Sequence, residues 1–407
     1  MVLARVTAPG TQRKLGTDML AIKNAKVVLE EGIIWNGVVI CDGERILEVG
    51  DANHVSIPDD TQVINAGGKY IAPGLIDIHA HGGNMTFFRD NPHKAAEMHF
   101  KQGTTTILPT MYQTDSLDDF KRGIDNYRNV EKDAVGRSMI GFYMEGPYLN
   151  PKYGSNAKNG QWKDSIDDKL MKELVDYAGQ DVAVWCVGPE REGIERFCKY
   201  AKTVKPAVKF SMAHSECKPW QAYSLKKYGL CSQTHHGNAT GVNNPIIPSN
   251  VGIRDVGPDE TALYDDDFYV ELISDSMGIH VKPHMLRLVV KIKGFNRVIL
   301  VTDHYPENCE NPEGPIMGGE KAPDLGYCIT GEVCGSMMTL NVACRNMMAH
   351  TGCSLPQVIK FASLNPARML GIDNLYGSVE KGKIANLILI DDMLNVEKVI
   401  FEGQVQK

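Results

Sequence analysis

The chain is organised around the stretch Ile71-Ala72-Pro73-Gly74-Leu75-Ile76-Asp77-Ile78-His79-Ala80-His81. Successive side chains of a strand point to opposite faces, so Asp77, His79 and His81 share one face. The apolar residues between them take the other face, which is typical of a parallel strand that packs against helices. Two imidazoles about 6–7 Å apart at the end of one strand can reach a single metal ion. The alternative is two polar residues near a strand end, and the positions of further ligands decide between these interpretations.

Downstream of this stretch, from Leu75 to about Ser354, predicted strands alternate with amphipathic helices. The eight strands are expected at residues 75–79, 104–108, 139–144, 182–187, 208–213, 230–234, 270–274 and 297–302. The spacing of apolar residues predicts helices at residues 115–130, 165–178 and 283–292. Eight strands with intervening helices over roughly 250 residues predict an α/β fold, a (β/α)8 barrel. An open doubly wound sheet is the alternative, but no glycine-rich phosphate-binding motif follows the first strand.

The residue pattern at both ends of the chain predicts short strands that are separated by turns containing glycine and aspartate. These strands are expected at residues 26–29, 37–41 and 45–49, and again at 385–390, 396–400 and 403–405. Either group alone is too small to form a stable sheet. We therefore expect one small β-sandwich domain assembled from residues 17–72 and 373–407. The barrel, residues 73–372, is inserted between its two parts.

Composition narrows the class of protein. The 407 residues carry a net charge of −7, and no basic run stands out, which argues against a nucleic-acid-binding protein. The ten cysteines lack the dense spacing of a disulfide framework and form no Cys-x-x-Cys pair, which predicts reduced thiols. The first twenty residues make a poor signal peptide, and no stretch approaches the roughly 20 apolar residues of a membrane span. We expect a cytoplasmic protein that binds neither nucleic acid nor membranes.

Residue types that bind metals recur at the carboxyl ends of five of the eight predicted strands. These residues are His79 and His81, Glu145, His214, His235 and Asp303. The carboxyl ends of the strands of a (β/α)8 barrel meet on one face, where reactive residues lie. Histidine and carboxylate side chains are the ligands of catalytic divalent metals, so their recurrence there predicts a metal centre. His236 faces the other side of a regular strand, so we expect it to pack or to support its neighbour.

These motifs resemble the amidohydrolase superfamily and, within it, the N-acetylglucosamine-6-phosphate deacetylases. The resemblance extends over residues 22–402. The matching segments are residues 73–81, 103–110, 144–150, 213–215, 234–235, 238–239, 301–303, 334–336 and 362–367. Many relatives use a carboxylated lysine where this chain has Glu145, and a glutamate in the segment Glu-Gly-Pro-Tyr-Leu-Asn indicates the deacetylase branch.

The resemblance implies one or two divalent metal ions per subunit, of zinc, iron, manganese or cobalt. The implied ligands of the first ion are Glu145, His214 and His235. The implied ligands of a second ion are His79 and His81, with Glu145 or Asp303. Some family members lack the two early histidines and hold one metal. Because this chain keeps them, a binuclear site is expected.

The resemblance also implies catalytic and substrate-binding roles. Asp303 takes the proton of the attacking water and returns it to the leaving amine. His280 contacts the substrate and orients or polarises its carbonyl group, the alternative being a structural histidine. The implied substrate-binding residues are Asn238, Ala239, His280, Asn156, Gly335 and Ser336. Family members are often homodimers in which a residue of the neighbour reaches the substrate, so we expect a homodimer here.

Three departures from the family pattern concern the substrate. Relatives carry an arginine for the sugar phosphate shortly after the Asn-Ala pair, whereas the first arginine here is Arg254. Asn156 stands where the family often has a histidine, and residues 308–327 resemble an insertion. The expected function is hydrolysis of an N-acetylated amino sugar, with N-acetylglucosamine 6-phosphate as the leading candidate. The alternatives are another or an unphosphorylated N-acetyl sugar, an N-acyl amino acid, a cyclic amide, or a non-catalytic scaffold.

Overall fold

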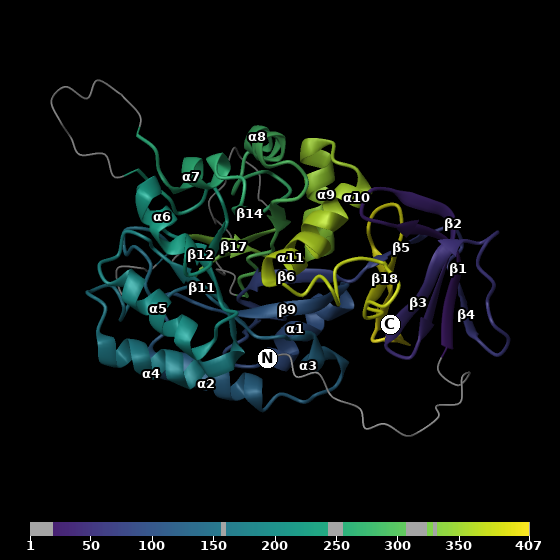
Figure 1. Ribbon diagram of the computed structural model, residues 1–407, viewed down its shortest axis with the longest axis horizontal. Coiled ribbons are helices and arrows are strands. Elements are labelled where there is room, and N and C mark those ends of the chain that lie inside the picture. The colour runs from purple at the N-terminus through teal and green to yellow at the C-terminus, as the bar shows by residue number, and fades with distance from the viewer. Residues whose placement is uncertain (1–18, 156–159, 243–254, 307–323, 329–331, 407) are drawn as a thin grey trace.

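The computed structural model describes residues 19–155, 160–242, 255–306, 324–328 and 332–406. These residues form a parallel barrel and a mixed sheet, which lie side by side along the longest axis of the molecule (Figure 1). Helices α9, α10 and α11 lie between them in the same view. No helix within the described ranges is long and apolar enough to cross a membrane.

The barrel contains eight parallel strands in sequence order. They are β6 (Leu75–Ala80), β9 (Thr104–Met111), β10 (Phe142–Met144), β11 (Val182–Val187), β12 (Lys209–Met212), β13 (Leu230–Gln233), β14 (Tyr269–Leu272) and β15 (Val298–Leu300). The first and last strands meet just beyond β15, where Ala80 and His304 form a parallel bridge. The Asp303 amide donates to the His79 carbonyl at 2.8 Å. The expected (β/α)8 barrel is confirmed, and each predicted strand overlaps an observed one.

Helices cover the outside of the barrel. They are α1 (Pro92–Lys101), α2 (Leu117–Arg128), α3 (Ala134–Ser138), α4 (Asp168–Ala178), α5 (Ile194–Val204), α6 (Pro219–Lys226), α7 (Pro258–Tyr264), α8 (Pro283–Lys293), α9 (Leu340–Thr351), α10 (Leu355–Ile359) and α11 (Asn365–Leu370). A 3-10 turn at Gly179–Asp181 follows α4, and a π-helical turn at Lys360–Leu364 joins the last two helices. Helix α2 shows why such a helix forms. A capping box of Ser116 and Asp119 starts it, and it buries Phe120 and Ile124.

The second sheet draws strands from both ends of the chain, as expected. Its strands are β1 (Met19–Val28), β2 (Ile33–Asp42), β3 (Arg45–Asp51), β4 (Gln62–Asn65), β5 (Tyr70–Pro73), β18 (Leu387–Ile390), β19 (Val396–Phe401) and β20 (Gln404–Val405). They form one connected mixed sheet in which β5 lies between β1 and β18. The start of β3 also bridges to Ile384, so the sheet curls back on itself. The exact limits of the two domains stay a prediction.

Strand β18 joins the two parts of the molecule through the alternation of its side chains. Leu387 and Leu389 belong to the apolar core of the mixed sheet. Ile388 and Ile390 point the other way and belong to the core of the barrel. One strand thus takes part in both cores.

The short connection from β5 to β6 fixes where the first barrel strand begins. The Gly74 amide donates to the Asn386 carbonyl at 2.8 Å, and the Ser363 hydroxyl donates to the Gly74 carbonyl at 2.7 Å. A Cβ atom on Gly74 would lie 2.1 Å from Thr105 Oγ1, which explains why glycine stands there. The entry into β6 is therefore held by residues from three distant segments.

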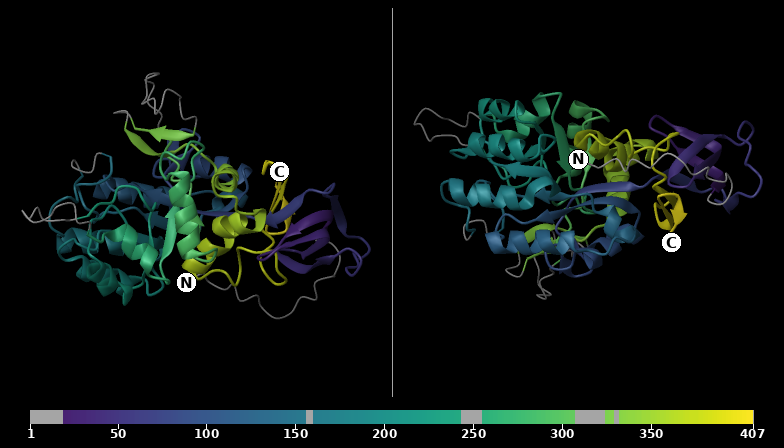
Figure 2. Two further views of the ribbon diagram at one scale, coloured as in Figure 1. Left: turned by 90° about the horizontal axis from the view of Figure 1, so that it is seen from above. Right: turned by 60° about the horizontal axis from the view of Figure 1, so that its bottom comes forward.

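Two short hairpins stand at the carboxyl end of the barrel. One pairs β7 (Gly82–Gly83) with β8 (Thr86–Phe87), and the other pairs β16 (Leu325–Tyr327) with β17 (Val333–Ser336). The second hairpin, in light green, projects from the barrel in the left view of Figure 2. Most of the segment 308–327 that resembles an insertion lies outside the described residues.

Candidate metal centre

All six predicted metal ligands meet at the carboxyl end of the barrel. They are His79 in β6, His81 one residue beyond β6, Glu145 directly after β10, His214 and His235 two residues beyond β12 and β13, and Asp303 three residues beyond β15. None of the six is more than 8% exposed. Because each comes from the same end of a parallel strand, the barrel itself brings them together.

Three of these ligands converge on one point. The Nε2 atoms of His214 and His235 lie 2.8 Å and 3.0 Å from Glu145 Oε1, and 3.1 Å from each other. Metal–nitrogen and metal–oxygen bonds of 2.0–2.1 Å in a tetrahedron place ligand atoms roughly 3.3 Å apart. The observed separations are close to that value, so the spacing of the three atoms fits three ligands of one metal ion.

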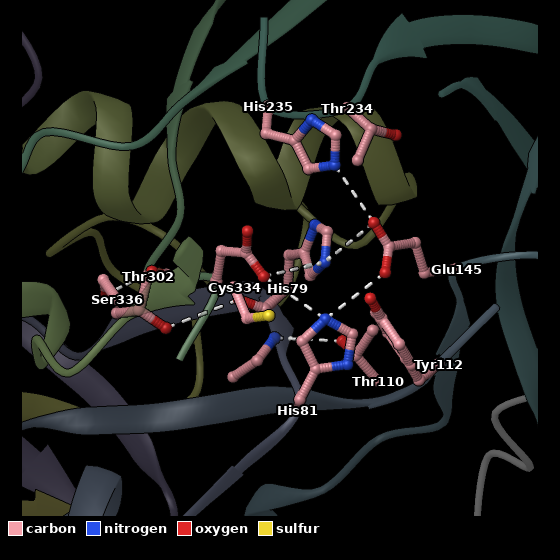
Figure 3. Close-up of polar contacts among 12 residues, drawn as sticks. His79, His81, Thr110, Tyr112, Glu145, Thr234, His235, Thr302, Cys334 and Ser336 are labelled. Atoms are coloured by element: carbon pink, nitrogen blue, oxygen red, sulfur yellow. Dashed lines mark hydrogen bonds and ion pairs between the residues drawn. The ribbon is translucent and has the colours of Figure 1, made fainter. Parts of the chain in front are cut away.

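The other carboxylate oxygen of Glu145 faces a second group of ligands. His81 Nε2 lies 3.3 Å from Glu145 Oε2 and 3.3 Å from Asp303 Oδ1. His79 Nε2 lies 3.4 Å from the same Asp303 oxygen. Figure 3 shows Glu145 between His235 on one side and His81 on the other. Glu145 is thus placed to bridge two neighbouring sites.

Opposite charges dominate the electrostatics of the centre. Burial opposes the charged form of the Glu145 carboxyl, yet His214, His235 and His81 hold its pKa well below its usual range. Burial likewise disfavours the charged forms of His81 and His235. The contacts with the negatively charged Asp303 and Glu145 nevertheless raise the pKa of His81 to about 10, and Glu145 raises the pKa of His235 to about 9. The negative charges of Glu145 and Asp303 therefore stabilise positive charge at the centre.

The residues fit a pair of divalent cations. Several ligand atoms are buried without a hydrogen-bond partner among the described residues, including His79 Nε2 and Glu145 Oε2. Such atoms are rare in folded proteins unless they bind water or an ion. Two buried groups can each surround one ion, His79 with His81 and Glu145, and Glu145 with His214 and His235. This arrangement is consistent with a binuclear metal site that shares Glu145.

The backbone turns sharply at three of the ligands. His214, His235 and Asp303 have φ angles of 42°, 28° and 46°, in the left-handed region that residues with a Cβ atom rarely adopt. Hydrogen bonds hold these turns. Asn150 N donates to the His214 carbonyl at 3.0 Å, and Ser336 N donates to the Asp303 carbonyl at 2.9 Å. Left-handed residues of this kind cluster at active sites, where the surrounding structure imposes them.

A cavity of about 250 Å³ opens above the ligands. Of the predicted substrate-binding residues, Asn238, Ala239, His280 and Gly335 line it. Ser336 is fully buried and is not among the described lining residues; its hydroxyl donates to the Thr302 carbonyl. Asn156, like Arg254, lies outside the described residues. Gly335 also lies close to Asp303, because a Cβ atom there would sit 2.2 Å from the Asp303 carbonyl oxygen.

His280 is held in the cavity wall by a carboxylate that the sequence reading did not single out. Its Nδ1 atom lies 3.2 Å from Asp275 Oδ2. The same carboxylate accepts hydrogen bonds from the backbone amides of Ile279 and His280. Burial would raise the pKa of the Asp275 carboxyl, but the hydrogen bonds from His280 and these amides lower it. The spacing of an aspartate five residues before a histidine, directly after a predicted strand, was the available signal.

Glu190 is a second residue that sequence reasoning missed. Its carboxylate accepts hydrogen bonds from the Asn150 amide group at 2.8 Å and from the Ser215 hydroxyl at 2.6 Å. Asn150 lies in the loop after Glu145, and Ser215 directly follows His214. Glu190 therefore ties together the two loops that carry Glu145 and His214. Nothing in its local sequence marks this role, because its partners are distant along the chain.

Comparison with known proteins identifies the family. A model of the amidohydrolase family matches residues 70–406. The chain therefore belongs to the amidohydrolase family, as the resemblance of its motifs implied.

Several known proteins are similar over nearly the whole chain. An N-acetylglucosamine-6-phosphate deacetylase of Bacillus subtilis is 27% identical and covers 95% of this chain and 97% of its own length. An N-acetylgalactosamine-6-phosphate deacetylase of Escherichia coli O157:H7 is 26% identical over 86% of this chain and 90% of its own. An N-acetyl-D-glucosamine-6-phosphate deacetylase variant from Mycobacterium smegmatis, solved in complex with N-acetyl-D-glucosamine 6-phosphate, has the same fold. Its TM-score is 0.78 at 23% identity, and the match covers 96% of this chain and 99% of that one.

Two adjacent histidines allow a matched test of the metal centre. The His235 ring faces Glu145. The His236 ring instead forms a hydrogen bond of 2.6 Å between its Nδ1 atom and Gln233 Oε1. We expect His235→Asn to weaken metal binding more than about tenfold, since loss of a ligand should exceed the loss of a supporting residue. His236→Asn should retain the metal. The measurement is metal content after dialysis at a fixed free-metal concentration, with circular dichroism to verify folding. Equal metal loss in both variants would contradict the assignment.

Proposed function

We propose that the protein is a metal-dependent deacetylase of an N-acetylated hexosamine, with N-acetylglucosamine 6-phosphate as the leading substrate. The observation that carries the proposal is the convergence of four imidazoles and two carboxylates beneath a cavity lined by Asn238, Ala239 and His280. The names of the similar proteins support the same reaction class, on two epimeric sugars. The products would be the free amino sugar and acetate.

The chain's own residues suit amide hydrolysis. A bound divalent metal would bring the pKa of a bound water towards 7 and polarise the acetyl carbonyl. Burial opposes the charged form of Asp303, but His79 and His81 hold its pKa well below the usual range, so the group is present as the carboxylate, the form in which it can accept a proton. It can then deliver that proton to the nitrogen of the departing amine, which must be protonated to leave.

His280 completes the proposed site. Asp275 holds its ring through Nδ1, while its buried Nε2 atom has no hydrogen-bond partner among the described residues. Because His280 lines the cavity together with Asp303, Nε2 is available to contact the substrate's acyl group. A fixed ring direction reduces the reorganisation needed when substrate binds.

The sugar phosphate is the less supported part of the substrate. None of the described residues that line the cavity is a lysine or an arginine. Arginine binds phosphate with two parallel hydrogen bonds, and its place is not readily taken by neutral groups. A cation from a segment outside the described ranges, such as Arg254, or from a second subunit would supply this contact. An unphosphorylated N-acetylhexosamine is therefore the second candidate substrate.

A second copy of the chain is the proposed partner. Three successive helices, α6, α7 and α8, carry large exposed apolar side chains, and α7 contacts the other two helices (Figure 1). We infer that these side chains form one apolar patch. The patch comprises Trp220, Tyr223, Tyr264, Met285, Leu288 and Ile292, which are 37–84% exposed. Large exposed apolar patches mark protein–protein contacts more often than isolated apolar residues do. We infer that two copies associate through this patch.

Acetate release from a panel of sugars tests the substrate. The panel contains N-acetylglucosamine and N-acetylgalactosamine, each with and without a 6-phosphate, and N-acetylglutamate as an unrelated N-acyl compound. We expect the highest kcat/KM with N-acetylglucosamine 6-phosphate. A preference for the unphosphorylated sugars would replace the leading substrate by the second candidate. Metal-loaded protein that releases no acetate from any sugar would refute the proposed function.

Replacing Asp303 tests the proton transfer. Asp303→Asn keeps an oxygen ligand but removes the group that accepts and returns the proton. We expect acetate release to fall about 10²–10⁴-fold, the usual contribution of general acid–base catalysis. The metal content, measured in the same preparation, should stay close to that of the wild type. Turnover near the wild-type rate would remove Asp303 from the mechanism.

The apolar patch predicts the oligomeric state. Light scattering after gel filtration should give a mass of about twice 44.9 kDa for the wild type. The double variant Leu288→Lys/Ile292→Lys should give the monomer, because two buried charges without partners destabilise an interface. Trp35→Lys is the control, since Trp35 is 68% exposed on the distant mixed sheet. A monomeric wild type, or a dimer in both variants, would reject this interface.

A further inference from the structure

A carboxylate lies inside the barrel below the metal centre and takes no part in the mechanism above. It belongs to Glu271 in β14, which is completely buried. The Tyr143 hydroxyl donates to this carboxylate and lies 2.9 Å and 3.0 Å from its two oxygens. Within the described residues, His79 is the one basic side chain in ion-pair range of Glu271. A buried carboxylate is costly unless positive charge or several hydrogen bonds compensate it, so its place beside a metal ligand calls for an explanation.

The His79 ring stands between Glu271 and the ligand cluster. Its Nδ1 atom is 3.6 Å from Glu271 Oε2, within ion-pair range but longer than an ordinary hydrogen bond. Its Nε2 atom, on the opposite side of the ring, is 3.4 Å from Asp303 Oδ1. Neither nitrogen has a hydrogen-bond partner among the described residues. One nitrogen thus faces the barrel interior while the other faces the second candidate metal position.

The position of Glu271 is itself well fixed. The Tyr143 hydroxyl, besides its contact with Glu271, lies 2.7 Å from Thr234 Oγ1, which in turn lies 2.7 Å from Ser211 Oγ. The Tyr143 ring stacks on the His79 ring, with 4.7 Å between centroids and 26° between planes. Tyr143 therefore holds both the carboxylate and the imidazole. The Glu271 side chain has little freedom to turn away from His79.

We propose that Glu271 is a positioning residue for the second metal ion. Its carboxylate accepts a hydrogen bond from the Nδ1–H group of His79. The distance between Nδ1 and Glu271 Oε2 shortens to that of a hydrogen bond when metal is bound. This fixes the tautomer in which the lone pair of Nε2 faces Asp303 and Glu145, the residues that would hold the ion together with His79. Histidine ligands of metals commonly donate their other ring nitrogen to a carboxylate, which orients the ring and strengthens it as a ligand.

The two candidate metal positions differ in whether they include His79. The first candidate group, Glu145 with His214 and His235, does not include His79. Glu271 therefore acts on the group that contains His79 and His81, and it determines whether the chain holds two ions or one. The inference rests on the metal centre proposed above and is independent of which substrate the enzyme takes.

Metal titration of Glu271→Gln tests this role. Chelation first removes metal from the full-length protein, which is then titrated with Zn²⁺. At each point, elemental mass spectrometry measures how many zinc ions are bound per chain. We expect the wild type to bind two ions per chain. In Glu271→Gln the first ion should bind with unchanged affinity and the second about 10–100-fold more weakly. Unchanged affinity for the second ion, equal weakening of both, or a wild type that binds one ion would overturn the proposal.

Two further variants keep the test decisive. In a His79→Asn background, Glu271→Gln should cause no additional loss of the second ion, because the residue acts through His79. An equal loss with and without His79 would overturn the proposal. Tyr143→Phe keeps the carboxylate but removes its donor, and should weaken the second ion alone. If Glu271→Gln does not fold, Tyr143→Phe replaces it in the test. Unchanged affinity of Tyr143→Phe for the second ion would then overturn the proposal. Since the readout is ion count and affinity, a failure to release acetate would leave this result unaffected.

Discussion

The Glu145 carboxylate is the interaction on which the centre depends. Its two oxygens face different partners, Oε1 toward His214 and His235 and Oε2 toward His81. A carboxylate this deeply buried is tolerated only with strong compensation from neighbouring positive charge or hydrogen bonds. The barrel supplies that compensation from the ends of three other strands, β6, β12 and β13. Histidines that are far apart in sequence therefore contact the same carboxylate. The site can form only when the barrel has brought these strand ends together.

The site is also built into the way the barrel closes. The amide of Asp303 donates to the carbonyl of His79, so the same two residues that face the second metal position join the first strand to the last. Left-handed backbone at His214, His235 and Asp303 costs on the order of 1–3 kcal/mol each. That cost is acceptable because the rest of the barrel imposes the turns, which direct His214 and His235 toward Glu145 and Asp303 toward His79 and His81. Catalytic geometry here is a property of the strand ends rather than of flexible loops.

Much of the fold was predictable because its signals are local. The alternation around His79 and His81, the eight strand positions and the ligand types at their ends all follow from the order of residues along short segments. Asp275 was missed although it lies only five residues before its partner His280. Glu190 and Glu271 were not predicted, because each contacts a side chain from another part of the fold. The burial of Ser336 was missed for the same reason, since its hydroxyl is used by the Thr302 carbonyl. Asn156 and Arg254 stay predictions, as they lie outside the described residues.

The position of β5 in the mixed sheet has a consequence for how the chain is made. Strand β5 is paired on one side with β1 and on the other with β18, and it leads directly into the first barrel strand. The pairing of β5 with β18 can form only after residues 387–390 have been synthesised, so until then β5 lacks its partner on that side. An unpaired edge of this kind can pair with another chain. The entry to the barrel therefore depends on residues near the C-terminal end of the described chain, although its first strand is made early. Shortened chains that lack β18 would leave β5 with an unpaired edge prone to aggregation.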